Sequence, residues 1–269
     1  MPILSFAKDN LKYYQLTKQL ITRDVAGRYR GSQLGMAWTV INPLLMLSVY
    51  TLVFSQVFKA RWGAGTEPQS PLAFALNLFA GLLVFNFFAE CANRSPTLIT
   101  SNPNYVKKIV FPLHVLGTTI VGSALVHALT STAILILAKL IIDRQVPITC
   151  LLLPLVWIPL VLGTLGMSWL LSSAGVFLRD IGQLTGAIVS MLMFLSPIFY
   201  PASALPKGLQ WLASLNPLAS SIEQTRGILI AGEVPELTQW VIQVIVSILW
   251  CEFCFRMLQR AKPNFGDML

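Results

Sequence analysis

Charged residues are scarce in this sequence. They make up 11% of the 269 residues, whereas 55% are hydrophobic and the mean hydropathy is +0.69. An average soluble domain has about 25% charged residues. A soluble chain with so few charges could not cover its surface, so we expect lipid to be the solvent for much of this chain.

Several catalytic and nucleotide-binding motifs are missing. There is no G-x-x-x-x-G-K-[ST] phosphate loop, so we do not expect the chain itself to bind ATP in that way. There is no G-x-S-x-G or H-E-x-x-H motif. The only histidines, His114 and His127, lack the i, i+4 spacing of a helical metal pair. We therefore predict no catalytic residue, no metal site and no cofactor in this chain.

Cysteines are few, and no signal peptide is visible. Cys251-x-x-Cys254 has a metal or redox spacing, but no second pair or nearby histidine accompanies it, so two small apolar residues on a membrane helix are the favoured interpretation. About 36 residues precede the first apolar run, without a short apolar segment and cleavage site. We expect the first run to remain as an uncleaved anchor.

Six apolar segments approach the length of about 20 residues that a membrane-spanning helix needs. They lie at about 37–58, 72–92, 113–140, 150–177, 184–200 and 237–258, and the fifth is short and runs into prolines. We predict an all-α membrane protein with six transmembrane helices, forming one transmembrane domain over residues 1–269.

The net charge of +8 indicates membrane topology more than nucleic-acid binding, because the basic residues cluster between apolar segments and no basic soluble domain is present. With the N-terminus inside, 13 of the 19 Lys and Arg residues fall on the cytoplasmic side. Six spans return the C-terminus to the same side, where three of these basic residues lie. We expect both termini in the cytoplasm.

A basic, amphipathic segment, which we call the basic lead, precedes the first span. Residues 8–26 are predicted to form a helix in the membrane interface, with an ordinary cytoplasmic helix as the alternative. Arg23, Arg28 and Arg30 would lie at the anionic surface, and Trp38 would mark the interface. Asn42-Pro43 is expected to interrupt the helix just after it enters the hydrocarbon.

Two connections are unusual. The inner loop, 93–112, contains three prolines and would present a short surface helix that docks a neighbour or packs only on its own bundle. The outer stretch, 201–236, contains two half-length amphipathic pieces, 205–215 and 218–231, separated by Asn216-Pro217. Half-length helices are tolerated at membrane depth where protein buries them or where they line a cavity, so they could constrict an exit.

The acidic residues within the spans have local partners. Glu90 has Arg94, and Glu252 has Arg256, four residues later and near the inner ends of their spans. Helical pairing explains both acids without a proton path.

Aromatic residues gather on the first and fifth spans. They are Tyr50, Phe54 and Phe58 on one helical face, and Phe194, Phe199 and Tyr200. Such rings could stack on the CH faces of a sliding sugar polymer, or they could pack against lipid and other helices.

Four stretches together resemble the membrane subunit of bacterial polysaccharide ABC exporters, a group of type-2 ABC transporter permeases. They read RYRGSQLGMAWTVINPLL at 28–45, NPNYVKKIVFP at 102–112, GVFLRDIGQL at 175–184, and SPIFYP with a downstream LNPL at 196–218. The resemblance covers nearly the whole chain. It implies a homodimer in the bacterial inner membrane, with two copies of a separate cytoplasmic ATPase that binds ATP and Mg²⁺, moving a lipid-linked glycan.

The resemblance also implies roles for parts of the chain. The segment 102–111, with Asn102, Tyr105, Val106, Lys107 and Lys108, would take the stroke of the ATPase. The first and fifth spans would line the channel. The outer half-helices would form a gate that includes Trp211, Asn216, Glu223 and Arg226.

The residues of these motifs resemble exporters of O-antigen and teichoic acid more closely than exporters of capsule. A permease for small lipids or drugs is the alternative from the same superfamily. A membrane-embedded transferase is a third class, but it would need an acidic or histidine site facing one leaflet, which the sequence does not indicate.

Overall fold

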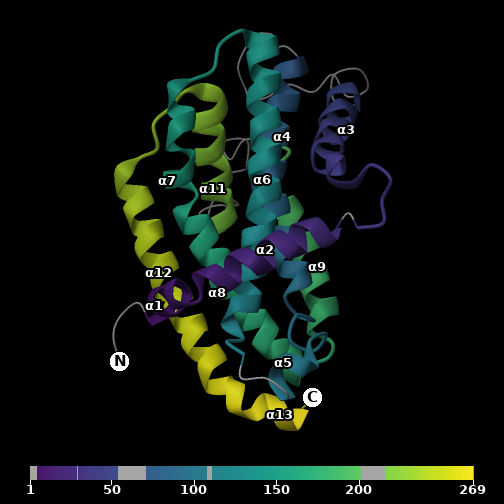
Figure 1. Cartoon of the computed structure of the whole chain (residues 1–269). Helices are drawn as coiled ribbons and strands as arrows, with labels where there is room; N and C mark the ends of the chain where they lie inside the picture. Colours follow the sequence, from purple (N-terminus) through teal and green to yellow (C-terminus); the bar gives the residue numbers. More distant parts are fainter. Residues whose placement is uncertain (1–4, 29, 54–70, 108–110, 201–215, 269) are drawn as a thin grey trace.

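The computed structural model describes residues 5–28, 30–53, 71–107, 111–200 and 216–268, and within these ranges it is helical, with no strand. The α-helices are α1 Ser5–Lys12, α2 Tyr14–Arg28, α3 Trp38–Leu52, α4 Pro71–Arg94, α5 Pro103–Lys107, α6 His114–Asp143, α7 Leu153–Val156, α8 Ile158–Phe177, α9 Ile181–Leu195, α11 Pro217–Arg226, α12 Leu237–Ala261 and α13 Phe265–Met268 (Figure 1). Short 3₁₀ turns are η1 Gly35–Ala37, η3 Ile148–Leu152 and η6 Lys262–Asn264, and η5 Gly227–Ala231 is a π-helical turn.

Five described helical stretches are long and apolar enough to cross a membrane. They are Gly35–Leu52, Leu72–Arg94, His114–Asp143, Ile148–Phe177 and Leu237–Met268, and each overlaps a predicted span. The predicted fifth span corresponds to α9, which has only 15 residues. α9 stops at Leu195 because Ser196 is extended, as expected before Pro197. The count of six spans stays a prediction.

The centre of the bundle is α4, which packs against α6, α11, α3, α9 and α8 (Figure 1). Leu76, Leu78 and Val84 of this helix are at most 1% exposed. A helix that is apolar on most of its circumference must be surrounded by lipid or by other helices, and here other helices surround it. A second tight pair, α8 with α12, lies beside this centre.

The N-terminal region lies across the long helices, as Figure 1 shows for α2. Two helices occupy the region predicted as one, because the chain is interrupted at Tyr13. α2 packs against α6 with Leu20 and Val25 buried, while much of its other face is exposed. The predicted interruption at Asn42-Pro43 is not seen, since α3 continues through Pro43.

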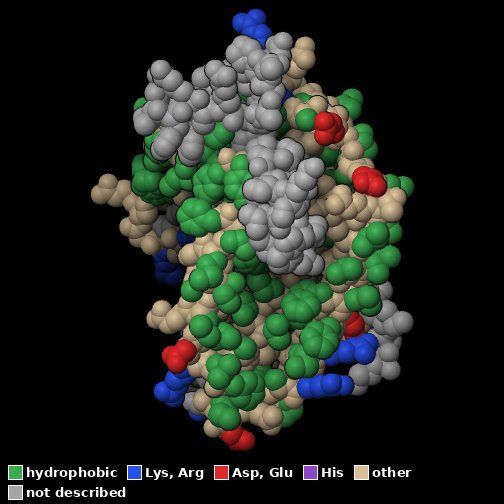
Figure 2. Space-filling view, turned by 180° about the vertical axis from the view of Figure 1, so that it is seen from behind, with side chains coloured by type: hydrophobic (Ala, Val, Ile, Leu, Met, Phe, Trp, Pro, Cys, Tyr) green, Lys and Arg blue, Asp and Glu red, His purple; other side chains and the backbone are tan. Residues whose placement is uncertain are grey.

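The outer surface of the bundle is largely apolar. Seen from behind, hydrophobic side chains cover much of the middle of the molecule, and many of the charged side chains lie toward its two ends (Figure 2). On α9 the exposed apolar side chains Leu184, Ile188, Met191 and Leu195 recur at helical spacing. This distribution is typical of a bundle whose solvent is lipid.

Candidate functional site

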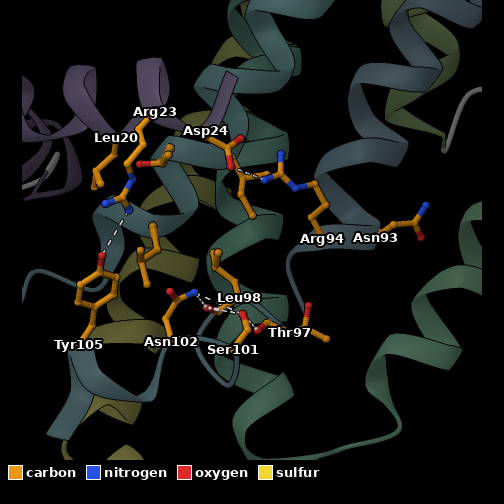
Figure 3. Close-up of a pocket in the computed structure, with 13 residues that line it drawn as sticks. Leu20, Arg23, Asp24, Asn93, Arg94, Thr97, Leu98, Ser101, Asn102 and Tyr105 are labelled. Atoms are coloured by element: carbon orange, nitrogen blue, oxygen red, sulfur yellow. Dashed lines mark hydrogen bonds and ion pairs between the residues drawn. The ribbon is translucent and has the colours of Figure 1, made fainter. Parts of the chain in front are cut away.

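A cavity of about 380 Å³ lies between α2, the start of α6 and the turn that joins α4 to α5. It is at the end of the bundle predicted to face the cytoplasm. Its polar lining side chains are Arg23, Asp24, Asn93, Arg94, Thr97, Ser101, Asn102, Tyr105 and Thr119 (Figure 3). The cavity therefore brings the basic lead and the predicted coupling segment together, although they are far apart in the sequence.

Tyr105 connects the coupling segment to α2. Its ring stacks on that of Phe111, with centroids 4.4 Å apart, and its hydroxyl accepts a 3.4 Å hydrogen bond from Arg23. Val106 is half-buried against the core, and the Asn102 carbonyl accepts a 3.1 Å hydrogen bond from the Tyr105 amide. These contacts agree with the alternative in which the loop packs on its own bundle. They leave docking of a neighbour as a prediction.

Of the two lysines of this segment, the structure describes only Lys107. Lys107 is exposed at the end of α5, where a partner could reach it. Lys108 lies outside the described residues.

Four charged residues join α2 to α4. Arg94 pairs with Asp24 at 2.7 Å and with Glu90 at 3.3 Å, and Glu90 also pairs with Arg28. Burial alone would raise the pKa of the Asp24 carboxyl, but its hydrogen bond from Arg94 and the charges of Arg94 and Arg28 outweigh burial and lower the pKa. The Glu90–Arg94 pair was predicted. The two partners from α2 were not, because pairing across 62 or 70 residues leaves no local pattern.

Glu252 of α12 holds the N-terminus of α1. Its carboxylate accepts hydrogen bonds of 2.6 Å from the Ser5 hydroxyl and 3.3 Å from the Phe6 amide. It also accepts one of 2.7 Å from Arg256, which confirms the predicted i, i+4 pair. A carboxylate at a helix N-terminus satisfies free N–H groups and complements the helix dipole. The first helix is thereby fixed to the last.

The other members of the basic lead differ in their surroundings. Arg30 is exposed. Trp38 is half-buried, and its indole N–H donates a 3.0 Å hydrogen bond to the Ser32 hydroxyl. That bond fixes the orientation of the indole ring at the start of α3.

The aromatic residues of the predicted pathway lie on two helices. Tyr50 of α3 is half-buried against the core, and its helical neighbours at 54 and 58, Phe54 and Phe58, lie outside the described residues. The rings of Phe194 and Phe199 stack with centroids 6.1 Å apart, and the Tyr200 hydroxyl donates a 3.0 Å hydrogen bond to the Phe194 carbonyl. The cluster at the end of α9 is thus ordered by its own contacts, with Phe194 exposed.

The second outer half-helix begins where the sequence predicts. Asn216 caps α11, since its side-chain oxygen accepts a 3.0 Å hydrogen bond from the Leu218 amide, and Pro217 occupies the first turn. Gly232, with φ of +76°, ends the turn η5 that follows α11. α11 packs against α4, so this half-helix is buried by protein. The first half-helix, including Trp211, lies outside the described residues.

Arg226, predicted as part of the outer gate, is buried, with 4% of its surface exposed. Its guanidinium donates to three backbone carbonyls, at 2.8 Å to Asn77 of α4, at 2.6 Å to Ile198, and to Pro197. Glu223, one turn earlier, is 3.5 Å away. We call this group the Arg226 clamp, because it joins α11 to α4 and to the segment after α9.

Two glycines allow close approaches between segments of the bundle. A Cβ atom at Gly81 would meet the Arg226 guanidinium, and one at Gly175 would overlap the Pro96 carbonyl. Gly175 therefore lets α8 contact the turn that leads from α4 to the coupling segment.

The described residues contain no group of three or more His, Cys, Asp and Glu side chains placed to hold a metal ion. His114 lies between the rings of Tyr13 and Phe255, with centroids 5.6 and 5.5 Å away. Cys251 and Cys254 are buried and free. These histidine and cysteine side chains therefore contribute to the packing of the helices.

The chain is similar to known membrane transport proteins. The family described as "ABC-2 type transporter" matches residues 15–230. The chain is 28% identical over 227 residues to an O-antigen export system permease protein of Klebsiella pneumoniae, covering 84% of each chain. It is 25% identical over 269 residues to one of Myxococcus xanthus, covering 99% of this chain and 100% of the relative. It is also 26% identical over 224 residues to an Escherichia coli polysialic acid transport protein, covering 81% and 82%.

Proposed function

Since the chain belongs to the ABC-2 type transporter family, we propose that it is the permease subunit of an ATP-driven exporter that moves a lipid-linked polysaccharide across the bacterial inner membrane. The observation that carries this proposal is the similarity to an O-antigen export permease over the full length of both chains. O-antigen is accordingly the substrate class we favour, as part of lipopolysaccharide biosynthesis.

The proposed assembly contains two copies of this chain and two copies of a separate ABC ATPase, which binds ATP and Mg²⁺. The absence of a phosphate loop from the sequence is consistent with this division of labour. Both termini would face the cytoplasm, following the distribution of Lys and Arg. In this assembly α3 and α9 would line the path, and α11 with the Arg226 clamp would form part of the outer gate.

Reconstitution tests the proposed function. The chain and its ATPase would be purified together, placed in proteoliposomes and supplied with lipid-linked glycan on the outside of vesicles in which the ATPase faces outward. We expect glycan to enter the lumen only with hydrolysable ATP. Transport of a fluorescent phospholipid or drug, without transport of glycan, would favour the small-molecule alternative.

A capsule substrate is the second candidate, because the similarity to a polysialic acid transport protein covers 81% of the chain. The same vesicles separate the two classes. If the vesicles transported a lipid-linked capsular polymer faster than lipid-linked O-antigen, we would assign capsule as the substrate.

Tyr105→Ala is expected to uncouple ATP hydrolysis from export. The change removes the stacking on Phe111 and the hydrogen bond from Arg23, so movement at α5 would no longer reach α2. We expect transport per ATP hydrolysed to fall about tenfold or more, the effect of roughly 1.4 kcal/mol of coupling. The measurement compares ATPase and transport rates in one preparation.

Tyr105→Phe is the matched variant, because it keeps the ring and loses only the hydroxyl. We expect an intermediate effect if the Arg23 bond transmits movement. A Val106→Asp variant places a charge on the same half-buried surface and should also uncouple. Wild-type coupling in Tyr105→Ala and Val106→Asp would remove this segment as the coupling element.

A further inference from the structure

A second cavity, of about 340 Å³, lies in the cleft between α3, α4 and α6. Each helix turns one face toward it at helical spacing. These faces consist of Thr39, Asn42, Pro43 and Met46 on α3, of Phe79, Leu83, Asn86, Glu90 and Asn93 on α4, and of Ala124, His127, Ala128 and Ser131 on α6. The cleft extends from the predicted cytoplasmic interface, where Arg28 and Trp38 lie, into the depth of the apolar helices.

Amide side chains are concentrated in this cleft. Asn42, Asn86 and Asn93 are exposed within it, although Asn42 and Asn86 belong to helices that are otherwise strongly apolar. An amide facing hydrocarbon without a partner is unfavourable, and polar residues within membrane helices face a bundle interior or an aqueous cavity. The three amides therefore indicate a polar ligand or water in the cleft.

The lining also offers hydrogen-bonding capacity that the described residues leave unused. Pro43, one turn after Thr39, has no N–H to donate to the carbonyl of that residue. A hydroxyl-rich ligand could donate to the Thr39 carbonyl, which Pro43 leaves without its helical donor.

The charges at the mouth of the cleft are already compensated. Arg28 and Glu90 are ion-paired with each other, and Glu90 is also 3.3 Å from Arg94. An anion would have to compete with Glu90, whereas an uncharged polar ligand would not. The rings of Trp38, Phe79 and Phe87 complete the lining, and apolar walls with a few fixed polar groups are typical of small-molecule sites.

We propose that this cleft binds one sugar residue of the lipid-linked glycan within a single copy of the chain. Amides offer a donor and an acceptor to neighbouring sugar hydroxyls, and the half-buried ring of Trp38 can contact the CH face of the sugar. This inference rests on the proposed function and adds a sugar-binding subsite separate from the aromatic cluster at the end of α9.

Photolabelling of the permease–ATPase complex in nanodiscs tests the site. The probe is farnesyl diphosphate linked to N-acetylglucosamine, with a diazirine on the sugar. We expect label on peptides from α3, α4 or α6, and competition by free N-acetylglucosamine. Competition by farnesyl diphosphate alone, without competition by the free sugar, would assign the cleft to a lipid phosphate instead and overturn the proposal.

Two leucine variants sharpen the test. Asn42→Leu and Asn86→Leu keep a similar side-chain volume and remove the amide, and each should lower labelling roughly tenfold, as expected for the loss of one or two hydrogen bonds. Gln239→Leu, an exposed amide on α12 outside the cleft, should label like the wild type. Both cleft amides are exposed, so both cleft variants should unfold at about the wild-type temperature, which separates loss of the site from loss of the fold.

The outcomes separate this inference from the proposed function. A wild-type complex that transports glycan but labels elsewhere, or leucine variants that label like the wild type, would overturn the sugar site alone. A wild-type complex that transports no glycan would overturn the function on which the site depends.

Discussion

Replacing Arg226 with methionine is expected to lower the free energy of unfolding by roughly 3–5 kcal/mol and to abolish export. The side chain is buried and donates to carbonyls of Asn77, Pro197 and Ile198. Methionine has similar bulk but leaves these carbonyls without their donor, and each buried unsatisfied group costs about 1–3 kcal/mol. Thermal unfolding in detergent and transport in proteoliposomes measure the two effects.

The Arg226 clamp can also be tested without changing the arginine. Gly81→Ala places a methyl group where the guanidinium lies, so the side chain must leave its carbonyl acceptors. Gly186→Ala is the matched control, because a Cβ there has nothing within 4 Å. We expect Gly81→Ala to lose stability and export while Gly186→Ala retains both. Wild-type export by Gly81→Ala and Arg226→Met together would show that the clamp has no part in transport.

Gly175→Ala is expected to reduce ATP-driven transport at least tenfold. The added methyl group would overlap the Pro96 carbonyl, so the turn between α4 and α5 must move away from α8. That turn leads directly to Asn102 and Tyr105, and a tenfold effect corresponds to about 1.4 kcal/mol. Transport and ATP hydrolysis would be measured in the same vesicles. A displaced coupling segment should lower the transport rate more than the rate of ATP hydrolysis.

Gly163→Ala provides a control in the same helix. A Cβ at this position has nothing within 4 Å, and alanine favours a helix interior over glycine by about 1 kcal/mol. We therefore expect Gly163→Ala to be as stable as the wild type or more stable. Equal transport by the two alanine variants would mean that the turn accommodates the methyl group and that its contact with α8 does not matter for coupling.

The sequence predicted those parts of the fold that depend on local pattern. Hydropathy located the apolar helices, because a bilayer imposes a minimum length on each. Asn216-Pro217 predicted the start of α11, because an asparagine cap and a proline in the first turn are local signals. The pairs Glu90–Arg94 and Glu252–Arg256 followed from helical spacing in the same way.

Contacts between distant segments were not predictable from these patterns. Arg226 lies 149 residues from its acceptor Asn77, and nothing in the spacing of either residue indicates the other. The available signal was a charged residue in a half-length helix predicted to lie at membrane depth, where a charge marks a buried partner or a functional site. The three faces that form the cleft are likewise visible only once α3, α4 and α6 are placed together.

The hydrogen bonds from Ser5 and Phe6 to Glu252 have a consequence for biogenesis. The partners are 247 and 246 residues apart, so the first helix emerges from the ribosome long before its acceptor exists. At about 5–20 residues per second, this delay amounts to roughly 12–50 seconds. Throughout that interval α1 lacks its final anchor, and only insertion of the last helix completes the tertiary structure of the first.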